Sequence, residues 1–166
     1  EAAAKYKSDV IIQLSAGGAQ FFGGPAMKDA KQAQLLGAIS AARHVHTVAA
    51  QYGICVVLHT DHANRQLVPW VDALVDAGEQ EFAQTGRPLF SSHMLDLSEE
   101  PFDSNITECA RMLRRVSKIN MSLEIELGVT GGEEDGIGSE YENIDDDRLY
   151  TQPEQVLEAY NILRPI

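Results

Sequence analysis

The chain has 166 residues, of which 44% are hydrophobic and 23% charged, and its formal net charge is −12. A chain of this length can form one domain with a sizeable core, and it contains neither an apolar run of membrane-spanning length nor a visible secretory signal. Together with an acidity that argues against general nucleic-acid binding, which needs a basic surface, these features predict a cytoplasmic protein with no membrane segment.

The first half of the chain predicts two units of strand, turn and helix. Residues 1–5 have the composition of a helix end. Residues 10–15 form a β-branched run stopped by a glycine pair, which is typical of a buried strand, and the Ala-rich stretch 32–52 has helical periodicity. A second strand is predicted at 54–58 and an amphipathic helix at 67–82.

The second half repeats the pattern. A short strand is predicted at 88–92, a helix at 98–118 with Ser98 as its N-cap, a strand at 121–127, and a last helix after Thr151. Strands that alternate with helices indicate parallel βαβ units, in either a barrel or a doubly wound sheet. Four strands cannot close an eight-stranded barrel. If the fold is a barrel, residues 1–166 are therefore part of a single barrel domain.

The strand at 121–127 carries two acids on one face. Side chains alternate along a strand, so Glu124 and Glu126 share one face and the intervening leucines and isoleucine share the other. Two carboxylates at core-like positions need water, cationic partners or a metal ion, because uncompensated burial would cost several kcal/mol. A charged pocket at the carboxyl end of this strand is therefore predicted.

Polar residues also follow the other predicted strands. His62 and Asp61 come after the second strand, and Asp96 comes after the third. An imidazole can bind a metal beside a carboxylate that acts as general acid or base, and Asp96 and Glu126 are the acids that could complete a metal site with His62. A hydrogen-bonded loop explains 59–62 equally well, and His93 is assigned a supporting or structural position.

A glycine-rich acidic segment follows the fourth strand. It contains eight acids between Gly128 and Asp147 and no Lys or Arg. Glu133 and Glu134 lie between glycines, so a mobile loop could deliver a base to a substrate, although a solvated acidic loop is the simpler explanation. After the first strand, Ser15 and the glycines that follow could offer a hydroxyl and backbone N–H groups to an anion, or form a simple turn.

The two cysteines, Cys55 and Cys109, lie in a predicted strand and a predicted helix and have no metal-ligand spacing. We expect both to be buried thiols of a reducing compartment.

Several motifs occur together in one order, at 59–62, 67–70, 90–100, 123–136 and 149–154. In this combination the chain closely resembles the class II, metal-dependent fructose-bisphosphate aldolases over essentially its whole length. The run from Gly131 to Gly136 is similar to that of the long-loop, dimeric branch. The resemblance implies a (β/α)₈ TIM barrel of which this chain is strands two to five with their helices.

The resemblance also implies roles for individual residues. His62 matches a catalytic zinc ligand, and Asp61 matches the acid/base that acts on the C4 hydroxyl of the sugar. Asp96 and Glu126 match acidic metal-site positions, and Glu134 matches the loop carboxylate that exchanges a proton on dihydroxyacetone phosphate. The zinc would polarise the substrate ketone.

Ser15 matches a residue that contacts the triose phosphate. Ala16 and Ala63 stand where relatives often carry Asn and Cys, which leaves these roles in place. The implied cofactors are Zn²⁺, with two further histidine ligands outside this chain, and a monovalent cation. The implied partners are a phosphorylated sugar and a second subunit of a homodimer, with no nucleic acid and no membrane. Two alternatives stay open, namely a tagatose-bisphosphate aldolase and a catalytically silent structural homologue.

Overall fold

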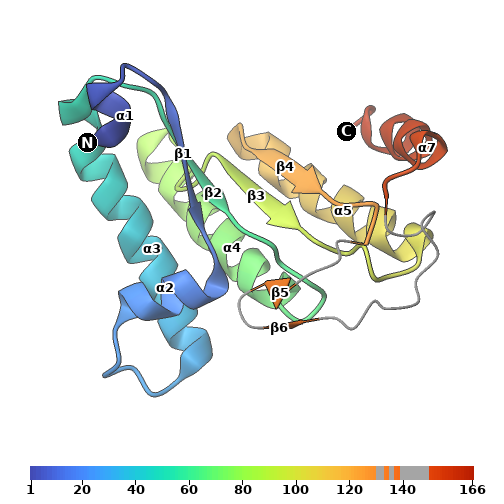
Figure 1. Cartoon of the computed structure of the whole chain (residues 1–166), viewed down its shortest axis with the longest axis horizontal. Coiled ribbons are helices and arrows are strands. Elements are labelled where there is room, and N and C mark those ends of the chain that lie inside the picture. Colours follow the sequence, from blue (N-terminus) through green and yellow to red (C-terminus); the bar gives the residue numbers. More distant parts are fainter. Residues whose placement is uncertain (130–132, 135–136, 139–149) are drawn as a thin grey trace.

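A computed structural model describes residues 1–129, 133–134, 137–138 and 150–166, and its main feature is one parallel sheet (Figure 1). The strands are β1 (Val10–Leu14), β2 (Val56–Thr60), β3 (Ser92–Leu95) and β4 (Ser122–Ile125), and they lie in the order β1-β2-β3-β4. A doubly wound sheet reverses its order at a switch point, whereas a barrel segment runs sequentially. The strand order therefore decides between the two predicted architectures in favour of the partial barrel.

Helices connect the strands and lie against one face of the sheet (Figure 1). The described helices are α1 (Ala2–Lys5), α2 (Ala16–Gly23), α3 (Ala30–Val48), η1 (Ala49–Tyr52), α4 (Val68–Thr85), α5 (Phe102–Val116), η2 (Ser117–Ile119) and α7 (Pro153–Leu163). A two-residue pair, β5 (Glu133–Glu134) and β6 (Ile137–Gly138), is antiparallel. None of the described helices is long and apolar enough to cross a membrane.

The core lies between the sheet and helices α3, α4 and α5. Its largest fully buried apolar side chains are Phe90, Leu74, Leu89, Leu95, Leu97 and Met112. Leu123 and Ile125 of β4 pack against this core. The predicted alternation is confirmed within β4, where Glu124 is exposed between the partly buried Leu123 and Ile125. The strand is shorter than the predicted 121–127, and Glu126 lies just beyond its end.

Two strands are displaced from their predicted bounds. His59 and Thr60 belong to β2 rather than to the loop after it, and β3 begins at Ser92, where the prediction ends. Polar residues were expected to mark the ends of strands, but polar side chains fit inside a strand when they are hydrogen-bonded. Thr60 and His93 satisfy this condition, because the Thr60 hydroxyl lies 2.9 Å from His93 Nδ1.

The segment predicted as a turn after β1 is the helix α2. Ser15 is its N-cap, and the Ser15 hydroxyl oxygen accepts a hydrogen bond from the Gly18 backbone N–H at 3.0 Å. This helix packs very closely on α3. A Cβ atom at Gly37 would lie 1.8 Å from the carbonyl oxygen of Ala19, so the approach of the two helices requires glycine.

Two helix starts also differ from the predictions. α5 begins at Phe102 after Pro101 rather than at Ser98, because the Ser98 hydroxyl is bonded to Asp96 instead of to the helix. α7 is capped by Gln152, and the Thr151 hydroxyl accepts a hydrogen bond from the Gly128 backbone N–H at 3.2 Å. Ser98 and Thr151 were expected as caps, but Ser98 bonds the nearby Asp96 and Thr151 makes a tertiary contact with Gly128.

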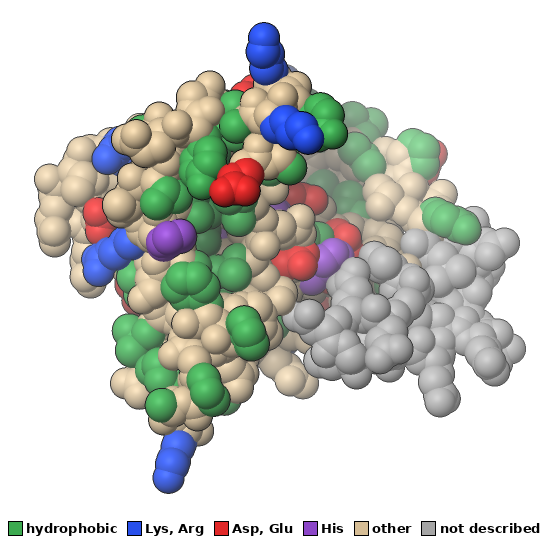
Figure 2. Space-filling model, turned by 60° about the vertical axis from the view of Figure 1, so that its left-hand side comes forward, with side chains coloured by type: hydrophobic (Ala, Val, Ile, Leu, Met, Phe, Trp, Pro, Cys, Tyr) green, Lys and Arg blue, Asp and Glu red, His purple; other side chains and the backbone are tan. Residues whose placement is uncertain are grey.

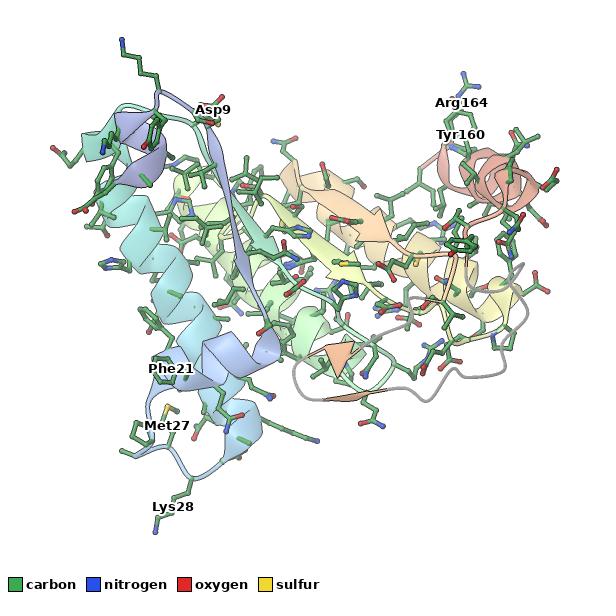
Figure 3. All side chains as sticks on the ribbon, in the orientation of Figure 1. Asp9, Phe21, Met27, Lys28, Tyr160 and Arg164 are labelled. Atoms are coloured by element: carbon green, nitrogen blue, oxygen red, sulfur yellow. The ribbon has the colours of Figure 1, made fainter. Side chains whose placement is uncertain are left out.

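The two ends of the described chain lie far from the middle of the sheet. Asp9, labelled in Figure 3, precedes β1 and accepts a hydrogen bond from the Cys55 backbone N–H at 3.0 Å. Cys55 itself is exposed, so its predicted burial is wrong, whereas Cys109 is buried as expected. At the other end, the Arg164 guanidinium lies 5.6 Å from the centre of the Tyr160 ring.

Candidate functional site

Three side chains converge beyond the carboxyl ends of neighbouring strands. His62 follows β2, Asp96 follows β3 and Glu126 follows β4, and their ligand atoms lie within 4.8 Å of one another. His62 Nδ1 is 3.0 Å from Asp96 Oδ2 and 3.8 Å from Glu126 Oε1. The three side chains are 18–26% exposed, so the cluster is accessible to a small ligand but shielded from bulk water. Figure 2 shows histidine and acidic side chains together near the middle of this face.

Asp96 is held in one orientation by its neighbours. Its Oδ1 accepts hydrogen bonds from the Ser98 hydroxyl at 2.6 Å and from the Ser98 backbone N–H at 3.3 Å. Burial is the largest single influence on this carboxyl and opposes ionisation, but the bonds from Ser98 and His62 outweigh it and lower the pKa of Asp96. Asp96 is therefore a carboxylate at neutral pH, with Oδ2 turned to His62.

Glu126 is positioned through its backbone from helix α5. The buried Asn105 amide donates a hydrogen bond to the Glu126 carbonyl oxygen at 2.8 Å, and the Asn105 side-chain oxygen accepts from the Cys109 thiol at 3.2 Å. Burial, with a smaller effect from Glu108 and an opposing one from Arg65, raises the pKa of Cys109 to about 12. The thiol therefore stays protonated and serves as the donor that fixes the amide.

Asp61 faces away from the cluster, toward β1. Its carboxylate accepts a hydrogen bond from the Gln13 side-chain amide, and its backbone N–H donates to the Leu14 carbonyl oxygen at 3.0 Å. Ser15 comes directly after Leu14 at the same edge of the sheet. The consecutive residues Asp61 and His62 therefore make contacts on opposite sides of β2. Asp61 contacts Gln13 of β1, and His62 contacts Asp96, which follows β3.

A second row of polar side chains crosses the sheet deeper on the same face. His59 Nδ1 shares a hydrogen bond with the Ser92 hydroxyl at 2.6 Å, and His59 Nε2 lies 3.0 Å from Glu124 Oε2. The latter contact lacks hydrogen-bond directionality and is an electrostatic approach only. Glu124, an unexplained acid in the sequence, is therefore paired with a buried imidazole and does not belong to the three-residue cluster.

His93 lies on the opposite, helix-facing side of the sheet. It is 1% exposed, its Nδ1 contacts the Thr60 hydroxyl, and its ring lies 5.2 Å from that of Phe90. Burial, with a smaller contribution from the neighbouring His59, lowers the pKa of His93 to about 3. A permanently neutral imidazole inside the core is structural, which agrees with the position expected for it.

The donor set of the cluster suits a divalent metal. One imidazole nitrogen and two carboxylate oxygens are ligand types that zinc accepts in catalytic sites, which keep further positions open. The hydrogen bonds that orient Asp96 and the Glu126 backbone are of the kind that hold ligands around such ions. Among the predicted site residues, the Glu134 side chain lies outside the described residues, although its backbone pairs with Ile137.

Three supporting residues were not predicted from the sequence as parts of the site. Gln13 bonds Asp61, Ser98 bonds Asp96, and Asn105 bonds the Glu126 backbone. Gln13 is a polar residue inside a β-branched strand, and Asn105 is an amide on the buried face of a helix. Each pattern signals a required hydrogen-bond partner, but the identity of that partner depends on how the elements pack.

Comparisons with known proteins show which family the chain is similar to. The family model described as "Fructose-bisphosphate aldolase class-II" matches residues 1–164. The chain is 56% identical over 168 residues to "Fructose-bisphosphate aldolase class 2" of Escherichia coli K12 and 53% identical to "Fructose-bisphosphate aldolase" of Haemophilus influenzae. Each alignment covers 100% of this chain and 46% of the relative, so the chain spans about half the length of these relatives.

A solved structure gives the same match. The chain superposes on the crystal structure of a fructose-bisphosphate aldolase from Campylobacter jejuni with a TM-score of 0.84 and 48% sequence identity. The match covers 99% of this chain and 44% of that structure. The four parallel strands therefore match part of a TIM barrel.

Proposed function

Because the chain belongs to the class II fructose-bisphosphate aldolase family, we propose that its protein reversibly cleaves fructose 1,6-bisphosphate to dihydroxyacetone phosphate and glyceraldehyde 3-phosphate. This family is metal-dependent and acts on phosphorylated sugars. The observation that carries the proposal is the convergence of His62, Asp96 and Glu126 at the carboxyl ends of three neighbouring strands. That end of the strands is where barrel enzymes build their active sites.

His62, Asp96 and Glu126 are the residues that would hold the metal, which we propose to be zinc. A zinc ion at this position supplies a Lewis acid that polarises the substrate ketone. His62 Nδ1 faces both carboxylates, at 3.0 Å from Asp96 Oδ2 and 3.8 Å from Glu126 Oε1. These are the three atoms that would serve as ligands, and the Ser98 hydrogen bonds to Asp96 Oδ1 would keep Oδ2 turned toward the ion.

Asp61 is the proposed general acid/base. In the cleavage direction its carboxylate takes the proton of the C4 hydroxyl as the C3–C4 bond breaks, and in condensation it returns the proton to the aldehyde oxygen. The Gln13 amide holds the carboxylate in one orientation. An oriented acceptor avoids the cost of arranging the group during the reaction.

Ser15 and Glu134 complete the proposed machinery. The Ser15 oxygen already accepts from the Gly18 N–H, so its hydroxyl proton is free to donate to the triose phosphate. Glu134 is proposed as the carboxylate that exchanges the proton on dihydroxyacetone phosphate. A homodimer and a cytoplasmic location are also proposed, and both rest on the resemblance to the long-loop branch of the family.

The proposal is tested with two perturbations of the full-length protein. Exhaustive chelation should abolish cleavage of fructose 1,6-bisphosphate, zinc should restore it, and borohydride with substrate should trap no Schiff base. Asp61→Asn should lower kcat by about 10²-fold or more while the bound zinc content stays unchanged.

Asp103→Asn is the matched control, because Asp103 is an exposed acid at the start of α5. A coupled assay for glyceraldehyde 3-phosphate measures both rates. Full activity after chelation, or an unchanged kcat in Asp61→Asn, would contradict the mechanism. A higher kcat/KM for tagatose 1,6-bisphosphate would replace the proposed substrate.

A further inference from the structure

A polar cavity that is open to solvent, because most of its polar lining residues are exposed, lies at the opposite end of the sheet from the proposed active site. It has a volume of about 270 Å³. Its polar lining residues are Arg43, His46, Thr47, Glu81, Thr85 and Arg87. They come from the second half of α3, the last turns of α4 and the segment that leads into β3. This is the amino-terminal end of the strands, so the cavity is separate from the cluster around His62.

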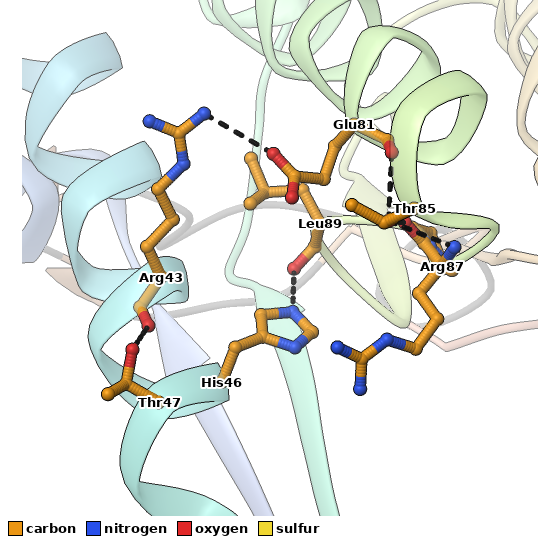
Figure 4. A pocket seen from close by; sticks show the side chains of 8 residues that line it. Arg43, His46, Thr47, Glu81, Thr85, Arg87 and Leu89 are labelled. Carbon is orange, nitrogen blue, oxygen red and sulfur yellow. Dashed lines mark hydrogen bonds and ion pairs between the residues drawn. The ribbon is translucent and has the colours of Figure 1, made fainter.

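The lining is basic although the protein is acidic. Two arginines and a histidine face a single acid, Glu81, in a chain whose net charge is −12. Arg43 and Glu81 form an ion pair at 3.3 Å. Arg87 contacts no carboxylate among the described residues, and Figure 4 shows its guanidinium directed toward the His46 ring. The cavity therefore has one guanidinium in excess of its internal carboxylate.

Most other donors in the cavity are already used, which restricts what it can bind. The Thr47 hydroxyl donates to the Arg43 carbonyl oxygen, and the Thr85 hydroxyl bonds the Glu81 carbonyl oxygen at 2.9 Å. His46 Nε2 lies 2.9 Å from the Leu89 carbonyl oxygen, which can only accept, so Nε2 carries a proton. The donors left for a ligand are the N–H groups of the two arginines, because Nδ1 of the neutral His46 ring is an acceptor.

The volume sets the size of that ligand. Pockets for drug-sized molecules measure about 300–1,000 Å³, so a cavity of about 270 Å³ fits a smaller group. Guanidinium groups bind phosphate and carboxylate oxygens in a bidentate manner. We propose that this cavity is a binding site for a small phosphate-class anion, held by Arg87 and Arg43. In the absence of the anion, the Glu81 carboxylate pairs with Arg43 and competes for the site.

Inorganic phosphate is the probe for the test. It is titrated into the protein while binding is followed by NMR at the His46 ring resonances, which His46→Asn identifies by their loss. We expect saturable shifts of His46 and a dissociation constant in the millimolar range. Arg87→Ala should weaken binding by about tenfold or more, since it removes a charge-assisted contact.

Glu81→Gln gives the opposite sign. Removal of the competing carboxylate should tighten phosphate binding by several-fold. The matched controls are Arg114→Ala and Glu158→Gln, which change the net charge equally at exposed positions away from the cavity. Phosphate that binds at the proposed active site would not shift His46 and would not respond to Arg87 or Glu81.

The proposal is overturned if Arg87→Ala and Arg114→Ala bind phosphate with equal affinity. It is also overturned if Glu81→Gln tightens phosphate binding no more than Glu158→Gln does. Absence of saturable His46 shifts overturns it as well. Arg87→Lys, which retains the charge but not the bidentate geometry, should fall between the wild type and Arg87→Ala. Far-UV circular dichroism verifies that each variant is folded.

Discussion

Gly37→Ala is the substitution for which the structure makes the sharpest quantitative prediction. In an isolated helix this change is favourable, because alanine exceeds glycine in helix propensity by about 1 kcal/mol. In α3 the new Cβ would lie 1.8 Å from the Ala19 carbonyl oxygen and 2.7 Å from the Gly23 nitrogen. Both are backbone atoms of α2, so no side-chain rotation relieves the overlap.

The size of the overlap decides which effect is larger. An ordinary contact begins at 3.4 Å, so the Ala19 carbonyl would have to retreat by about 1.6 Å. Overpacking of a core costs about 1–3 kcal/mol even where side chains can adjust, and here a whole helix must move. After subtraction of the propensity gain, Gly37→Ala should lower the free energy of unfolding by about 2 kcal/mol or more.

Gly78→Ala is the matched control, because Gly78 is also a buried helical glycine. Gly78 lies in the middle of α4, and a Cβ atom there would meet only Ile119 Cδ1 at 3.6 Å, an ordinary contact. This variant should therefore gain stability by up to about 1 kcal/mol. Urea unfolding followed by circular dichroism measures both changes, provided that the slopes against urea stay equal.

If Gly37→Ala is as stable as Gly78→Ala, the close approach of α2 to α3 is wrong. The consequence extends to the site, because α2 begins at Ser15. A shift of this helix moves the Ser15 hydroxyl, so Gly37→Ala should raise KM for the phosphorylated substrate more than it lowers kcat.

The first of three further predictions concerns His93, whose pKa is kept near 3 by burial, below its unfolded value of about 6.5. The free energy of unfolding should therefore fall as pH drops between these two values, by up to about 1.4 kcal/mol per pH unit. In His93→Gln the midpoint of urea unfolding should depend less on pH across this range. Iodoacetamide should label Cys55 and not Cys109 in the folded protein, as read by mass spectrometry; equal labelling would contradict the burial of Cys109. Asn105→Ala should lower the free energy of unfolding by about 1–3 kcal/mol, and it should weaken zinc binding because it removes the hydrogen bond that positions the Glu126 backbone. Zinc affinity measured by calorimetry tests this, and an unchanged affinity would limit Asn105 to a packing role.

The clustering of three proposed site residues could be predicted from the sequence, because parallel strands end at a common edge. His62, Asp96 and Glu126 each follow a strand within one or two residues, so their convergence is a consequence of topology alone. Their assignment as a metal site stays a prediction that zinc analysis can test. The strand order was not predictable from spacing, since barrels and doubly wound sheets have units of the same length.

What the sequence does not predict depends on tertiary packing. Gly17 and Gly18 disfavour a helix locally, yet α2 forms there because Ser15 caps it and its Ala19 packs tightly over Gly37. Likewise, Gln13 could be assigned to Asp61 only once the pairing of β1 with β2 was known, because the partner of a strand side chain is set by register.

Register is also what brings His62 and Asp96 together. His59 pairs with Ser92 across β2 and β3, and the next residues on each strand, Thr60 and His93, also contact each other. The first imidazole–hydroxyl pair lies on the open face of the sheet and the second on the helix-facing side. A slip by one residue would break both pairs and turn each side chain to the wrong face. His62 and Asp96 lie only three and four residues beyond the first pair, so these two hydrogen bonds fix the strand alignment on which the proposed metal site depends.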